Sequence, residues 1–193
     1  EAIKNVDVSG SVVYRYNNAD RDLQTNPSTS RQTENNNYKI GLNLSSKVND
    51  YVKFNSRFIV GDKTDFASLN SKKDDAGDTN ADVTLSQAYF GLTAIPNTVV
   101  NIGKQGLTTP YTVAVDINGN EQTGTGILAL STFGPVTAGA GYFNSTNVNE
   151  SGNGPISTTR LFNALNTAGA NGKGGLDMYV ATIQGDLDFV KLE

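Results

Sequence analysis

The chain contains no cysteine and no histidine among its 193 residues. The absence of cysteine excludes a disulfide framework and thiolate metal sites, and the absence of histidine excludes imidazole ligands. Neither a Ser-His nor a Cys-His nucleophilic pair can form without these residue types. Most classes of enzyme are thereby excluded, and the sequence predicts a protein that is not an enzyme.

Long apolar runs and basic clusters are also missing. No apolar run approaches the roughly 18–20 residues that a membrane-spanning helix needs, and the mean hydropathy is -0.36. The net charge of -4 comes from 15 basic and 19 acidic residues without long blocks of either sign. A basic surface for nucleic acid is therefore not expected. Membrane-spanning strands remain possible, because their hydrophobicity is hidden in alternation.

Apolar and polar side chains alternate along residues 6–17. Strand side chains point to opposite faces in turn, so such a segment separates an apolar environment from a polar one. A strand of an outer-membrane barrel has this pattern, with aromatic residues at the membrane interface. A half-buried strand of a soluble sandwich has it too, so both interpretations stay open here. The apolar set is Val6, Val8, Gly10, Val12, Tyr14 and Tyr16, and the opposite set is Asp7, Ser9, Ser11, Val13, Arg15 and Asn17.

Further segments have strand character and are bounded by Gly, Asn, Asp or Pro. In residues 83–93 neither alternate set is purely apolar, and we favour Ala88, Phe90 and Leu92 as the lipid face. The predicted strands after the first are residues 38–45, 52–60, 83–93, 98–105, 126–131, 136–143 and 178–187.

Short and long connections alternate strictly between these strands. An outer-membrane barrel has short turns on the periplasmic side and long loops outside, whereas a sandwich has no reason to keep this order. Four long loops are also rare in a small soluble domain. The pattern therefore favours an antiparallel transmembrane β-barrel. The short connections are residues 47–50, 94–98 and 132–135, and the long ones are residues 17–37, 62–82, 106–125 and 144–176.

Four cations occupy the polar faces of the first three predicted strands, namely Arg15, Lys39, Lys53 and Arg57. A cation facing lipid at the membrane midplane costs about 2–4 kcal/mol, so these side chains should face the barrel interior. We predict a water-filled lumen with a basic stretch of wall. The alternative is a plugged barrel in which the cations pair with carboxylates.

The third long connection contains the modestly apolar stretch PYTVAVDI, which carries Asp116, and then Glu121. A connection of this kind can fold into the lumen. Acidic residues on it would face the basic wall and create a transverse field that sorts solutes by charge. Two solvated loop acids are the simpler alternative, which the sequence taken alone favours.

Several motifs follow one another along the chain: EAIKNVDVSG and YRY near the start, IGKQ at residues 102–105, and then AVD and TGTG. In these motifs the chain resembles the trimeric major outer membrane porins of campylobacters. The resemblance implies an antiparallel barrel of about 16 to 18 strands in the outer membrane of a Gram-negative bacterium. It also implies a homotrimer, surrounded by outer-membrane lipid and lipopolysaccharide, through which small hydrophilic solutes and cations diffuse passively.

The resemblance further implies calcium near the constriction of the pore. Asp116 matches the AVD motif, and Glu150 is the nearest acidic residue available as a second ligand. Calcium needs several oxygen ligands, so these two carboxylates alone do not make a site. Lys104 of IGKQ resembles a pore-lining cation. No cofactor is required for the expected activity.

The residues form one β-barrel domain, 1–193, with roughly eight or nine strands, which is half of the number that the family barrel needs. The end at Lys191, Leu192 and Glu193 is polar rather than aromatic. Half a barrel would leave two open edges in lipid, so we interpret the chain as the N-terminal portion of a longer porin. The alternatives are a small self-closed barrel that acts as an anchor or adhesin, and a soluble β-sandwich binding module.

Overall fold

In a computed structural model, the described residues are 4–21, 31–61, 66–69, 82–115, 119–147, 177–187 and 190–192. Their strands are β1 (Lys4–Arg21), β2 (Arg31–Asn49), β3 (Val52–Val60), β4 (Ala67–Ser68), β5 (Val83–Leu92), β6 (Thr98–Gly106), β7 (Thr123–Phe133), β8 (Val136–Thr146), β9 (Met178–Leu187) and β10 (Val190–Leu192). Among these residues no helix is long and apolar enough to span a membrane.

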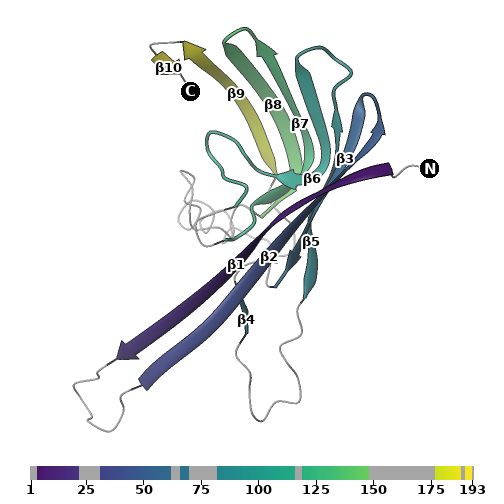
Figure 1. Cartoon of the computed structure of the whole chain (residues 1–193). Coiled ribbons are helices and arrows are strands. Elements are labelled where there is room, and N and C mark those ends of the chain that lie inside the picture. Colours follow the sequence, from purple (N-terminus) through teal and green to yellow (C-terminus); the bar gives the residue numbers. More distant parts are fainter. Residues whose placement is uncertain are drawn as a thin grey trace.

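All strands belong to one antiparallel sheet in the order β1-β2-β3-β5-β6-β7-β8-β9-β10, and β4 pairs with β2 outside this path. Figure 1 shows the sheet curling along its length, with β1 and β10 at its two edges. The prediction of an all-β antiparallel fold is confirmed. The described strands neither form the two packed sheets of a sandwich nor close on themselves as a small barrel.

The two faces of the sheet differ in chemistry. Directly opposite residues of neighbouring strands share a face. One such row joins residues Phe54, Phe90, Ile102, Ile127, Tyr142 and Tyr179. We call this face, which also carries Val8 and Val12 at 64% and 77% exposure, the outer face. The opposite face, here the inner face, carries Asn43, Arg57 and Leu128. Such exposed apolar side chains would be buried in a sandwich.

A β-bulge explains why residues 83–93 lack a clean alternation. The pairing of β3 with β5 shifts between Arg57 and Phe58, so Ser86 is an extra residue in β5. A bulge of this kind reverses the alternation of faces along the strand. The outer face accordingly carries Leu85 before the bulge and Phe90 after it. Phe90, predicted to face lipid, is 46% exposed and its ring lies 5.2 Å from that of Phe54.

The short turns lie at one end of the sheet, as the alternating connections predict (Figure 1). In two of these turns the backbone enters the left-handed region, at Asn97 with φ 56° and at Gly134 with φ 55°. Asn and Gly are the residues that adopt this conformation at the lowest cost. The local sequence therefore fixes these turns.

The connection predicted at residues 17–37 is wrong in its extent. Strand β1 continues to Arg21 and β2 begins at Arg31, and these two residues pair. Apart from Ala19, the sequence of this extension is polar, so no apolar alternation marks it. The backbone ladder forms nevertheless, because pairing satisfies N–H and C=O groups whatever the side chains are. Figure 1 shows the resulting long hairpin.

Candidate functional site

The connection between β6 and β7, residues 107–122, lies against the inner face of the sheet (Figure 1). Residues 107–115 and 119–122 of it are described. At its start, Leu107 is 1% exposed and packs with Leu128 and Phe143. At its end, Glu121 is 6% exposed and contacts β3. The connection is thus fixed to the sheet at both of its ends.

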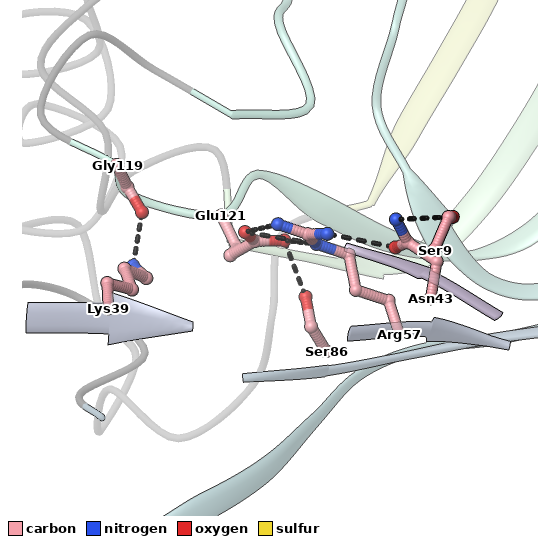
Figure 2. Close-up of polar contacts among 7 residues, drawn as sticks. All are labelled: Ser9, Lys39, Asn43, Arg57, Ser86, Gly119 and Glu121. Atoms are coloured by element: carbon pink, nitrogen blue, oxygen red, sulfur yellow. Dashed lines mark hydrogen bonds and ion pairs between the residues drawn. The ribbon is translucent and has the colours of Figure 1, made fainter. Parts of the chain in front are cut away.

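Glu121 forms a bidentate ion pair with Arg57 of β3 (Figure 2). The Nε and Nη2 atoms of Arg57 donate to Oε2 and Oε1 of Glu121, each over 3.0 Å. The two side chains are 15% and 5% exposed, so water screens the pair only weakly. Two parallel charge-assisted hydrogen bonds fix both the distance and the orientation of the groups. The pair therefore holds the 107–122 connection against β3.

Neighbouring polar groups complete this ion pair. The Ser86 hydroxyl, from the bulge of β5, donates to Glu121 over 2.9 Å. The Arg57 Nη1 atom donates to Asn43 Oδ1 over 2.9 Å, and the Asn43 amide reaches Ser9 over 3.5 Å. Figure 2 shows these side chains converging from β1, β2, β3 and β5. Buried charges need such partners, because an ion pair alone does not repay the loss of hydration.

Asn147, just beyond β8, fixes the backbone at the same point. Its amide donates to the Glu121 carbonyl over 2.7 Å, and its Oδ1 accepts from the Thr123 N–H over 2.7 Å. Its own N–H donates to the Thr123 carbonyl over 3.1 Å. The end of the connection is thus held to β8 as well as to β3.

Two further cations lie beside the connection. The Lys39 ammonium donates to the Gly119 carbonyl, as Figure 2 shows, and Lys39 is 6% exposed. Arg15 lies over the ring of Phe66, with its Cζ atom 4.0 Å from the ring centre. A Cβ added at Gly119 would lie 3.3 Å from this same ring. Lys39 and Arg57 therefore contact the connection directly, whereas Arg15 lies beside it through Phe66.

The remaining candidate residues lie elsewhere. Lys53 is exposed near the short turn, in register with Lys47 and Gly91. The pairing of β6 sets Lys104 opposite Ala88, in the row of the outer face, and its ammonium donates to the Leu85 carbonyl. We therefore leave Lys104 out of the inner wall. Asp116 and Glu150 lie outside the described residues.

Sequence reasoning missed Ser86, Asn43 and Asn147. Ser86 owes its position to the bulge, and Asn147 belongs to a stretch that is predicted as a polar loop. The sequence around Ser86 or Asn147 does not indicate either position, because each depends on which distant segment of the chain pairs with the strand that contains or precedes that residue. Glu121, by contrast, is one of the two acidic residues that the sequence suggests for an infolded connection. The alternative, a solvated loop acid, does not hold for Glu121, because the residue is only 6% exposed.

The ion pair changes the electrostatics expected of the wall. Glu121 neutralises Arg57, so this cation does not contribute a full charge to the inner face. The predicted basic stretch is thus partly compensated, because Arg57 pairs with a carboxylate. Lys39 and Arg15 also lie near the connection, in contact with the Gly119 carbonyl and the Phe66 ring respectively.

No group of three or more acidic residues placed to hold a metal occurs within the described ranges. The Glu121 carboxylate is already engaged by Arg57 and Ser86, so it does not offer a free ligand for calcium. Calcium binding at Asp116 and Glu150 stays a prediction from the resemblance.

A family model described as Campylobacter major outer membrane protein matches residues 1–185. This match covers β1 to β8 and most of β9. No curated protein matches the chain.

Proposed function

Since the chain belongs to the Campylobacter major outer membrane protein family and lies in the outer membrane of a Gram-negative bacterium, we propose that it forms part of the wall of a porin. Small hydrophilic solutes and ions diffuse through its water-filled lumen without any catalytic step, and the preference for cations is expected from the resemblance of its motifs. The 107–122 connection narrows this lumen.

One observation carries the proposal: the 107–122 connection is fixed on the inner face by the buried Arg57–Glu121 pair. The apolar row from Phe54 to Tyr179 faces the other way, which suits lipid. A sheet with an apolar outside and a polar inside is the arrangement of a transmembrane barrel wall. A connection that lies on the inside then reduces the cross-section of the lumen.

The described sheet is open, with β1 and β10 at its edges. Unpaired strand edges are not stable in lipid, so we propose that further strands close the barrel. We extend the proposal to a closed barrel in a homotrimer, in contact with lipid and lipopolysaccharide. Support for the trimer comes from the resemblance of the motifs to trimeric porins.

Planar-bilayer recording of the whole purified protein tests the proposed function. We expect stepwise increases of current as single assemblies insert, and a reversal potential under a KCl gradient whose sign shows cation preference. Liposome swelling should follow the size of neutral solutes. A protein that folds in detergent and inserts in liposomes but gives no steps of current would contradict the proposal.

The outer face provides an independent prediction about the membrane. Ile102, at the centre of the apolar row, is 44% exposed. Replacing Ile102 with Arg places a cation in lipid and should cost about 2–4 kcal/mol. The amount of folded protein in the outer membrane, measured by heat-modifiable migration, should fall strongly.

Asn101→Arg is the matched control, because Asn101 is the neighbour of Ile102 on the inner face. This variant should fold as well as the unmodified protein. Equal losses for both variants would show that the assignment of the two faces is wrong.

A further inference from the structure

A cavity of about 320 Å³ lies on the inner face, between the start of the 107–122 connection and strands β7 to β9. Residues 108–110 of the connection cover it. Its floor is aliphatic and consists of Leu128, Leu130 and Val180. The cavity is therefore separate from the Arg57–Glu121 pair, which fixes the other end of the connection.

Two glycines of β8 shape this floor. A Cβ at Gly139 would lie 2.7 Å from the Leu130 side chain and 2.8 Å from the Thr182 hydroxyl. A Cβ at Gly141 would lie 3.0 Å from the Leu128 side chain and 3.1 Å from that of Val180. Side chains of β7 and β9 thus meet over the bare backbone of β8, and they form a continuous apolar surface.

Hydrogen-bonding groups also line the cavity, and those of the sheet belong to Thr137, Thr182 and Gln184. The Thr137 hydroxyl lies 3.1 Å from that of Thr132. Within the part of the chain that the structure describes, the side chains of Thr182 and Gln184 make no hydrogen bond. The Thr182 hydroxyl and the Gln184 amide are therefore available to a solute.

The described residues that line the cavity carry no charged side chains. Residues 123–147, which include β7 and β8, contain no Asp, Glu, Lys or Arg, whereas β2 and β3 carry Lys39 and Arg57 on the inner face. A charged solute would lose hydration in the cavity without gaining a partner. The cavity accordingly suits a neutral solute.

We propose that this cavity is a subsite for one neutral pyranose ring. A β-glucopyranoside has C–H groups on both faces of its ring, which suit the aliphatic floor, and equatorial hydroxyls, which reach Thr182 and Gln184. The volume lies near the lower end of the roughly 300–1,000 Å³ of small-molecule sites, which fits one ring better than a chain of sugars. This subsite rests on the proposed function, because it requires that the inner face lines a lumen.

The test uses the whole protein in planar bilayers, with methyl β-D-glucopyranoside as the probe. We expect the glucoside to reduce the current in a saturable manner, and glucuronate, which has the same ring with a carboxylate, to show no saturation. Replacing Thr182 with Val and Gln184 with Leu should raise the half-blocking concentration about tenfold, since two hydrogen bonds are lost.

Thr125→Val is the control, because Thr125 is exposed on the outer face of β7. It should leave the half-blocking concentration unchanged. A linear effect of the glucoside, or equal saturation by glucuronate, would overturn the subsite while channel activity persists. Absence of any channel would instead overturn the proposed function. If the double variant does not fold, the comparison of the glucoside with glucuronate on the unmodified protein still tests the subsite.

Discussion

Replacing Glu121 with Gln will raise single-channel conductance and shift the reversal potential towards anions. The substitution removes the negative charge that faces Arg57 over 3.0 Å and leaves a cation that is only 15% exposed. An uncompensated buried charge costs about 3–5 kcal/mol. A cost of about 3 kcal/mol changes the ratio of attached to detached connection by about a hundredfold. Arg57 then also contributes its full charge to the lumen.

The Lys47–Asp50 ion pair supplies a matched control, because it is exposed at 57% and 83%. The hydrogen bond from Lys47 lowers the pKa of Asp50, so this carboxylate is charged in the conditions of the recording. Exposed ion pairs contribute little to stability, so Asp50→Asn should leave conductance and selectivity unchanged. Similar currents for Glu121→Gln and Asp50→Asn would show that the buried pair does not hold the connection.

Replacing Gly126 with Ala will prevent most of the protein from folding into the barrel. Gly126 lies at the bulge between β7 and β8. A Cβ there would lie 2.6 Å from the Phe143 Cα atom and would also meet the Tyr142 carbonyl oxygen. Backbone cannot yield as a flexible side chain does, so we expect a loss of about 3 kcal/mol from overpacking. Heat-modifiable migration and resistance to protease measure the folded fraction.

Gly185→Ala is the control for this substitution. Gly185 belongs to β9, and a Cβ there would meet no atom within 4 Å. Its replacement should leave the folded fraction unchanged. A normal yield of folded Gly126→Ala protein would contradict the close approach of β7 and β8 at Gly126.

The strands are predictable from the sequence because alternation is a local property. The segments beginning at Val52, Thr98 and Met178 have the expected starts. Alternation does not predict the strands correctly where their geometry or extent depends on pairing with another strand. Pairing with β3 creates the bulge at Ser86, and the mostly polar sequence of residues 17–21 hides the extension of β1 to Arg21.

The candidate site is predictable only in part, for the same physical reason. Alternation places Arg15, Lys39 and Arg57 on one face, and the composition of residues 106–125 indicates a connection that folds inward. The partner of each cation depends on how the chain returns to the sheet. Glu121 lies 64 residues after Arg57 in the sequence, and no local pattern encodes that contact. The face of Lys104 likewise follows from its pairing with Ala88 rather than from its motif.

The central claim is that the 107–122 connection is held inside the lumen by the contact of Arg57 with Glu121. A double-mutant cycle on single-channel conductance tests it most directly, with Glu121→Gln, Arg57→Gln and both together. Each single variant breaks the same contact, so we predict that each raises conductance and that the double variant raises it no further than either. Coupled residues are non-additive in this way, whereas independent ones add. A double variant whose increase equals the sum of the two single increases would contradict the claim.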